Sequence, residues 1–273
     1  MISSLPMRLH AVRNIFIVAA LCLIVGLPLH ADTNNLRVAA ASDLTYAFSE
    51  IAKSYEKRTG EKVNFTFAAS GLLARQIENG APFDVFAAAN TSYLEGLQRK
   101  KQIGPDDVHV YAIGHIGMYS RPGALRPPAK LAGLATARLD HIAIANPRVA
   151  PYGKAAEEAL TSAGILQQVQ SKLVFGENIQ QTMEFARSGN AEIAIVSASQ
   201  GQHQPGAFVP VPDSLHKPIV QAIGVVGGSA DKARAARFVA FVLGKEGQAI
   251  LHKSGFSSPP RSSSDGTRGQ AEK

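Results

Sequence analysis

The sequence has almost no cysteine. Its one cysteine, Cys22, lies in an apolar stretch near the N-terminus, and the preceding Leu21 is too large for the lipid-attachment signal of a lipoprotein. Once that stretch is removed, the chain can form no disulfide bond and can use no thiolate as a nucleophile or metal ligand. The 242 residues after position 31 can bury a large core without such cross-links.

The N-terminal apolar run is too short to cross a membrane as a helix. Ile15 to Leu27 comprises 13 residues, whereas a membrane-spanning helix needs about 20. Arg8 and Arg13 precede the run and the small Ala31 follows it, so residues 1–31 are predicted to be a secretory signal peptide that is cleaved after Ala31. The alternative is an uncleaved membrane anchor.

Basic stripes and metal-ligand clusters are also missing. Without Arg8 and Arg13, 26 basic and 21 acidic residues remain, and the only short basic run is Arg99 to Lys101. No basic stripe alternates with aromatic residues, which argues against nucleic-acid binding. The histidines form no close pair with the spacing of metal ligands. There is no internal repeat, and no linker rich in glycine and serine divides the chain into independent domains.

The most informative local feature of the sequence is a short strand-to-helix turn around Ser42, and its pattern recurs along the chain. Residues 38–41 are small or β-branched, as in a buried parallel strand. From Leu44 to Tyr55 the apolar residues recur at the spacing of one helix face. The N–H groups at a helix start lack intrahelical partners and lie at the positive end of the helix dipole, so this turn is suited to binding an anion. Alternatively, Ser42 is only a helix N-cap.

The same pattern recurs at Ser70. A strand over residues 63–67 is followed by Ser70, Gly71 and a second helical stripe. Gly71 allows a backbone N–H to approach a ligand closely. Because the carboxyl ends of parallel strands lie on one edge of a sheet, both serines are predicted to face the same crevice.

The remainder of the chain continues the alternation of strands and helices. Further strands are predicted over residues 85–89, 110–119, 141–145, 192–196 and 219–226, with helices between them and after the last one. The loop 104–107 is predicted to precede the second of these strands. The segment 258–273 is rich in serine, proline, glycine and charge and is predicted to be disordered.

Five motifs, in order over nearly the whole chain from Leu36 to Gly255, resemble those of the periplasmic molybdate-binding proteins of ABC transporters. They are Ala39-Ala-Ala-Ser42-Asp-Leu44, Phe67-Ala-Ala-Ser70-Gly with Leu73-Ala-Arg-Gln-Ile77, Gly80-Ala-Pro-Phe-Asp-Val-Phe86, Asn146-Pro147 with Ala150-Pro-Tyr-Gly-Lys-Ala-Ala156, and Gly176-Glu-Asn-Ile179.

This resemblance implies an α/β, two-lobed periplasmic binding protein fold of type II. The ligand cleft then lies between the lobes, and the chain crosses between them twice. Carried onto this sequence, lobe one comprises residues 32–110 and 218–257, and lobe two comprises residues 111–217.

The resemblance also implies a ligand site built from neutral donors only. Ser42 and Ser70 supply hydroxyl and N–H groups, Asp43 adds a backbone N–H, and Tyr152 and Ile179 supply backbone N–H groups from lobe two. The side chains of Asp43 and Glu177 are expected to point away from the ligand, and Arg148 and Lys154 to remain in solvent. Some family members place a ligand-binding tyrosine where this chain has Ser197, which is too short to replace it and is left out of the predicted site.

The function implied by the resemblance is capture of molybdate in the periplasm and its delivery to the membrane permease of an ABC importer. The protein is then a monomer that is not an enzyme and has no cofactor, with molybdate or tungstate as its ligand. Sulfate is an alternative ligand. The alternative from another class is a secreted serine hydrolase, because Ser54 to Lys57 matches the pattern Ser-x-x-Lys and Ser70 sits on a strand-to-helix turn. The flanking Gly-x-Ser-x-Gly and the partner motifs are absent.

Overall fold

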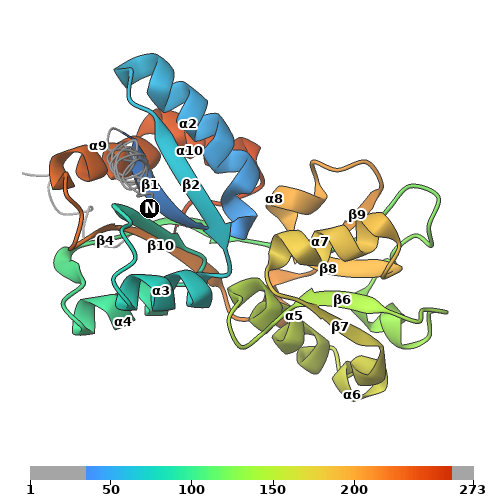
Figure 1. Ribbon diagram of the computed structural model, residues 1–273. Coiled ribbons are helices and arrows are strands. Elements are labelled where there is room, and N and C mark those ends of the chain that lie inside the picture. The colour runs from blue at the N-terminus through green and yellow to red at the C-terminus, as the bar shows by residue number, and fades with distance from the viewer. Residues whose placement is uncertain (1–34, 260–273) are drawn as a thin grey trace, which may run out of the picture. The chain divides into compact units, whose positions relative to one another are not determined.

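The computed structural model describes residues 35–259 (Figure 1). The predicted signal peptide lies outside the described residues, as does the predicted C-terminal tail from residue 260 onward. Among the residues described, no helix combines the length and the apolar character needed to cross a membrane.

The fold is α/β, as predicted, and contains two five-stranded sheets (Figure 1). The first sheet has the order β2-β1-β3-β10-β4. Its strands are β1 (Leu36–Ala41), β2 (Val63–Ala68), β3 (Val85–Ala88), β4 (Ile103–Gly114) and β10 (Ile219–Val226). β1 is parallel to both β2 and β3, whereas β10 is antiparallel to its neighbours.

The second sheet has the order β7-β6-β8-β5-β9, so the arrangement of the first sheet is repeated. Its strands are β5 (Ile116–Ser120), β6 (Ile142–Ala145), β7 (Leu173–Gly176), β8 (Ile193–Ser197) and β9 (Ala207–Pro210). β6 is parallel to β7 and β8, and β5 is antiparallel to β8 and β9.

The chain passes between the two sheets twice, as the type II fold requires. The first passage differs from the predicted one, because the single strand expected over residues 110–119 is two strands. β4 includes the predicted loop 104–107 and stays paired with β10 as far as Gly114, so the chain leaves the first sheet at His115 and not at Val110. The second passage lies between Pro210 and Ile219.

Helices connect the strands and cover the sheets. They are η1 (Ser42–Leu44), α2 (Thr45–Thr59), α3 (Ser70–Glu78), α4 (Thr91–Arg99), η2 (Leu131–Ala135), α5 (Pro151–Ser162), α6 (Leu166–Val169), η3 (Gln170–Lys172), α7 (Ile179–Ser188), α8 (Ala198–Gly201), η4 (Asp213–Leu215), α9 (Lys232–Leu243) and α10 (Lys245–Lys253). α2 buries the predicted stripe and ends at Gly60, whose φ of 74° is the left-handed conformation that favours glycine.

Strand β1 is buried on both faces, which explains its run of small apolar residues. Val38 and Ala40 pack in a large cluster with Phe48 of α2 and Phe238 of α9, whereas Ala39 packs in a separate cluster with Leu73 of α3 and with α4. Helices therefore cover both faces of the first sheet, and the carboxyl ends of its strands are the part left for a binding site.

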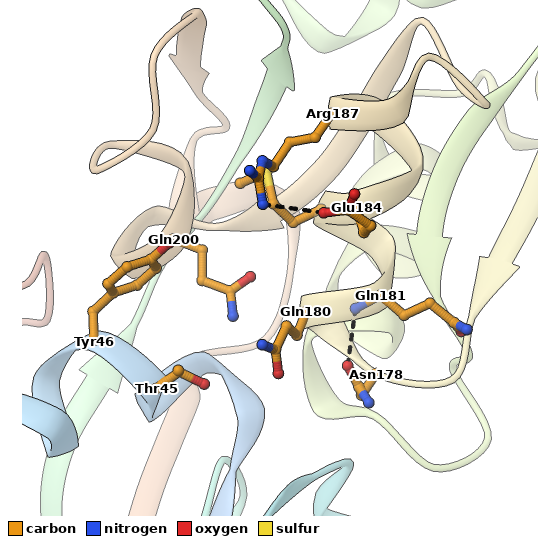
Figure 2. A pocket seen from close by; sticks show the side chains of 9 residues that line it. Thr45, Tyr46, Asn178, Gln180, Gln181, Glu184, Arg187 and Gln200 are labelled. Carbon is orange, nitrogen blue, oxygen red and sulfur yellow. Dashed lines mark hydrogen bonds and ion pairs between the residues drawn. The ribbon is translucent and has the colours of Figure 1, made fainter.

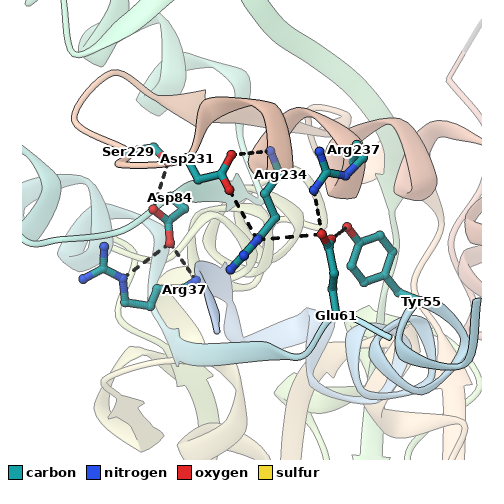
Figure 3. A network of polar contacts seen from close by, with 8 residues as sticks. All are labelled: Arg37, Tyr55, Glu61, Asp84, Ser229, Asp231, Arg234 and Arg237. Atoms are coloured by element: carbon teal, nitrogen blue, oxygen red, sulfur yellow. Dashed lines mark hydrogen bonds and ion pairs between the residues drawn. The ribbon is translucent and has the colours of Figure 1, made fainter. Parts of the chain in front are cut away.

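Two polar networks lie at the amino ends of β2 and β3 in the first sheet (Figure 3). Asp84, just before β3, accepts hydrogen bonds from the Arg37 N–H at 2.9 Å and from the Ser229 hydroxyl at 2.9 Å. Glu61, just before β2, accepts from the Tyr55 hydroxyl at 2.5 Å and from Arg237 at 2.6 Å. Both networks lie at the amino ends of β2 and β3, away from the turns that follow these strands.

Candidate functional site

Ser42 and Ser70 follow neighbouring strands at the same edge of the first sheet. The last register pair of β1 and β2 is Ala41 with Ala68, and the serines come one and two residues later. Both serines are buried and begin a helix, Ser42 in η1 and Ser70 in α3. The prediction that they share one edge of the sheet is confirmed.

The alternative that Ser42 serves only as a helix cap is wrong, and Ser70 does not cap its helix either. The N-cap positions are Ala41 and Ala69, and neither helix has a capping bond from a side chain. Within residues 35–259, the Ser42 hydroxyl has no hydrogen-bond partner. The Ser70 Oγ accepts a hydrogen bond from the Ala89 N–H at 3.0 Å, which leaves its own proton available. Both hydroxyls can therefore donate to a bound group.

The second sheet repeats this arrangement at Tyr152 and Ile179. The last register pair of β6 and β7 is Ala145 with Gly176. Each of these strands is followed by a helix that contains a predicted site residue in its first turn, Tyr152 in α5 and Ile179 in α7. The N–H groups of a first helical turn have no intrahelical acceptor, so both residues present the predicted backbone donors.

The carboxyl edges of the two sheets are in direct contact. The Gly71 N–H, in the first turn of α3, donates to the Val149 carbonyl oxygen at 3.0 Å. A Cβ atom on Gly71 would lie 3.0 Å from that oxygen, so the close approach favours glycine there. From the segment after β8, the Gln200 Nε2 donates to the Ser42 carbonyl and the Ser199 hydroxyl donates to the Asp43 carbonyl, both at 2.8 Å. All five predicted site residues thus belong to turns at these two meeting edges.

The side chain of Asp43 is directed into a buried polar cluster. Its Oδ2 accepts a hydrogen bond of 2.6 Å from the Gln221 Nε2 of β10, and the Tyr152 phenol also bonds to the carboxylate. Gln221 lies 2.9 Å from the Tyr152 hydroxyl oxygen, and its Oε1 accepts from the Tyr111 hydroxyl at 2.5 Å. The phenol of Tyr152 is therefore part of this cluster, which leaves the backbone N–H as the group that this residue offers to a ligand.

Burial raises the pKa of Asp43 from 3.8 to about 6, and the bonds from Gln221 and Tyr152 offset this only in part. The folded protein therefore holds this proton to a higher pH than the unfolded chain does. The contribution of Asp43 to stability therefore falls as the pH rises from about 4 to about 6 and stays lower above that range. We expect Asp43→Asn to remove this loss, so that its free energy of unfolding exceeds that of the wild type by up to about 3 kcal/mol at pH 7.5 and converges with it near pH 4.

Urea unfolding of both proteins at pH 4, 5, 6 and 7.5 measures this difference, in which the other titrating groups cancel. A difference that did not change with pH would contradict the raised pKa of Asp43.

The charged residues near the predicted site face solvent. Glu177, Arg148 and Lys154 are exposed, and Lys154 pairs with Glu157 at 2.7 Å on the surface of α5. Ser197 is buried, and its Oγ lies 3.0 Å from the Ser199 Oγ. Among the five predicted residues, the only charged side chain is that of Asp43, and it is engaged in the cluster with Gln221 and Tyr152.

A pocket of about 370 Å³ adjoins the site (Figure 2). It is lined by residues that directly follow the predicted turns, such as Thr45 and Gln180, and by Gln200 (Figure 2). Sequence reasoning missed Ser199, Gln200, Gln221 and Tyr111. No local pattern marks these residues, because each meets the site through a contact between distant parts of the chain.

The hydrolase alternative gains no support at its proposed nucleophile. The Ser54 hydroxyl donates to Glu246 on α10, so it is not paired with Lys57. Between residues 35 and 259, no group of three histidine, cysteine, aspartate or glutamate side chains is arranged to hold a metal ion.

Comparison with known sequences decides the family. The sequence profile described as "Bacterial extracellular solute-binding protein" matches residues 36–257. The chain belongs to this family. The resemblance predicted from the motifs is confirmed by this match together with the relatives and the solved structure described next.

Two similar proteins are both named as molybdate-binding proteins. The molybdate-binding protein ModA of Rhodobacter capsulatus is 36% identical over 239 residues, which cover 87% of this chain and 94% of that protein. The molybdate-binding protein ModA of Azotobacter vinelandii is 33% identical over 231 residues, which cover 83% and 91%.

Solved structures agree with the two-sheet fold of this solute-binding protein. The Azotobacter vinelandii periplasmic molybdate-binding protein matches with a TM-score of 0.77 and 29% identity, over 83% of this chain and all of that one. The sulfate-binding protein SubI of Mycobacterium tuberculosis matches with a TM-score of 0.71 at 13% identity, over 82% and 87%, and supports the fold alone.

Proposed function

We propose that this solute-binding protein captures molybdate and is not an enzyme. One observation supports the proposal above all: Ser42 and Ser70 begin helices at one sheet edge without capping them, so their hydroxyl protons are available to a ligand. The helix starts at Tyr152 and Ile179 add N–H donors from the second sheet. The relatives named as molybdate-binding proteins support the same ligand.

The chemistry of the donors favours an anion without protons. Molybdate is a dianion at neutral pH and only accepts hydrogen bonds, so hydroxyl and N–H groups can satisfy it. A protonated phosphate would bring a hydroxyl that needs an acceptor, and an unmet donor in a buried site costs about 1–3 kcal/mol. The ligand-binding residues of the proposal are Ser42, Asp43, Ser70, Tyr152 and Ile179, with Asp43 acting through its backbone N–H.

The proposal extends to how the protein works. The two sheets form the cores of two lobes, residues 32–110 with 218–257 and residues 111–217, that close on the ligand as a hinged pair. Because β4 stays paired with β10 as far as Gly114, we propose to move the first lobe boundary from residue 110 to His115. The protein acts as a monomer in the periplasm after cleavage of its signal peptide, and it delivers molybdate to the permease of an ABC importer.

Binding to molybdate is tested by calorimetry and thermal melting of the chain from residue 32 onward. We expect one molybdate per chain. At about 100 times the dissociation constant, the ligand should add about 2.7 kcal/mol to the free energy of unfolding. Tungstate is expected to behave similarly because of its similar size, whereas sulfate and phosphate should bind much more weakly. A clear shift with another anion and none with molybdate would overturn the assignment.

A further inference from the structure

Two side chains from the segment after β8 donate hydrogen bonds to the backbone of the turn that contains Ser42. The Gln200 Nε2 donates to the Ser42 carbonyl oxygen, and the Ser199 hydroxyl donates to the Asp43 carbonyl oxygen, each at 2.8 Å. Gln200 is 2% exposed and Ser199 is 1% exposed. These bonds join α8, which follows β8 of the second sheet, to the backbone of the proposed oxyanion-binding turn, which follows β1 of the first sheet.

The carbonyl groups that are held determine where the neighbouring N–H groups point. The Ser42 carbonyl belongs to the same planar peptide unit as the Asp43 N–H, and in a trans peptide the two groups point in opposite directions. The Ser42 carbonyl accepts hydrogen bonds from the Thr45 N–H and hydroxyl, the latter at 2.8 Å, and from Gln200 of α8, which follows the second sheet's β8. A carbonyl that accepts hydrogen bonds also polarises the N–H of its peptide unit and makes it a stronger donor.

The amide of Gln200 is only half satisfied, which argues against a purely stabilising role. Its Oε1 is buried and has no hydrogen-bond partner within residues 35–259. Figure 2 shows the amide at the pocket that Gln200 lines together with Thr45 of α2 and Gln180 of α7. A buried acceptor without a partner destabilises the fold. The Gln200 amide is thus oriented so that its Nε2 donates to the Ser42 carbonyl, while its own Oε1 accepts no hydrogen bond within residues 35–259.

We propose that Gln200, assisted by Ser199, is a positioning residue of the oxyanion site. Together with the Thr45 N–H and hydroxyl, it holds the Ser42 carbonyl and so aims the Asp43 N–H at the ligand, and the bond from Gln200 forms only when the two sheets are in contact. Contact between the sheets therefore completes a donor that belongs to one sheet alone. This inference rests on the proposed function, because the N–H of Asp43 is one of the proposed ligand donors.

The test replaces Gln200 by methionine, which has a similar size but cannot donate a hydrogen bond. We expect Gln200→Met to weaken molybdate binding about tenfold in calorimetry. The amide proton resonance of Asp43 in the ligand-free protein should also shift. The matched control is Gln204→Met, because Gln204 bonds to the Tyr46 hydroxyl and so joins the same two parts of the molecule without touching the turn. The control should bind molybdate within about twofold of the wild type.

The outcomes separate this inference from the proposed function. If the wild type does not bind molybdate, the proposed function fails, and an unchanged Asp43 amide resonance in Gln200→Met would then overturn the positioning role as well. If the wild type binds and Gln200→Met binds equally well, the inference is wrong. Equal losses in both variants would mean that contact between the sheets matters and positioning does not. Should Gln200→Met fail to fold, Ser199→Ala is the second variant, with a smaller loss of affinity and a shifted Leu44 amide resonance as its expected results.

Discussion

Ser70→Ala and Ser42→Ala are each expected to weaken molybdate binding by about 10- to 100-fold. Each variant removes one hydroxyl that donates to a dianion, and a hydrogen bond to a charged group contributes about 1.5–3 kcal/mol. The loss is measured by calorimetric titration with molybdate. Ser54→Ala is the matched control, because Ser54 lies 12 residues after Ser42 in the chain, on α2, and its hydroxyl bonds to Glu246 of α10.

The two serine variants should differ in stability. The Ser70 Oγ is the acceptor for the buried Ala89 N–H, so Ser70→Ala leaves that donor unpaired and should destabilise the ligand-free protein by about 1–3 kcal/mol. The Ser42 hydroxyl has no partner within residues 35–259, and Ser42→Ala should leave the melting temperature of the ligand-free protein almost unchanged.

If the site holds its ligand with neutral donors, replacing the exposed Arg148 should affect affinity far less than removing a serine hydroxyl does. Replacement of Arg148 by glutamine should have only a small effect on affinity, and that effect should shrink with added salt. If Arg148→Gln abolished binding while Ser70→Ala did not, the anion would be held by a cation and the assignment of the two turns would be wrong.

Gly153→Ala should have the largest structural effect of any conservative change near the site. A Cβ atom at this position would lie 2.0 Å from the carbonyl oxygen of Ala145 and 2.6 Å from its carbon. Both are backbone atoms at the end of β6, so the start of α5 must move away from the sheet. Overpacking typically costs about 1–3 kcal/mol, and a clash with backbone belongs at the upper end of that range or beyond it.

The same movement should weaken ligand binding, because the N–H of Tyr152 is in the turn that must shift. We expect at least a tenfold loss of molybdate affinity together with a lower melting temperature, and both are measured on the same preparation. Gly96→Ala in α4 is the control: its Cβ would approach only Arg99, at 3.8 Å, and alanine is the better helix former. Wild-type melting and affinity in Gly153→Ala would contradict the close packing of α5 on β6.

Local patterns in the sequence were enough to predict the elements that carry the site. The apolar run before Ser42 and the helical stripe after it each reflect one element packing on its own neighbours, so they can be read over a few residues. The placement of Ser42 and Ser70 at one edge followed from strand direction alone. The motif resemblance pointed to the family and named Tyr152 and Ile179. The same periodicity could not show that residues 103–120 form two strands, because an apolar run does not reveal where its pairing partner changes.

Sequence by itself therefore determined the α/β alternation, the two serine turns and the family. Only the tertiary structure decided how those turns are held. Gln200 bonds to Ser42, which lies 158 residues away in the sequence, and Gln221 bonds to Asp43, which lies 178 residues away. It also decided that the serines do not cap their helices, since Ala41 and Ala69 occupy the cap positions. The physical reason is range: hydrophobic periodicity records the burial of one element, whereas these hydrogen bonds join segments that are distant in the chain and meet only in the folded protein.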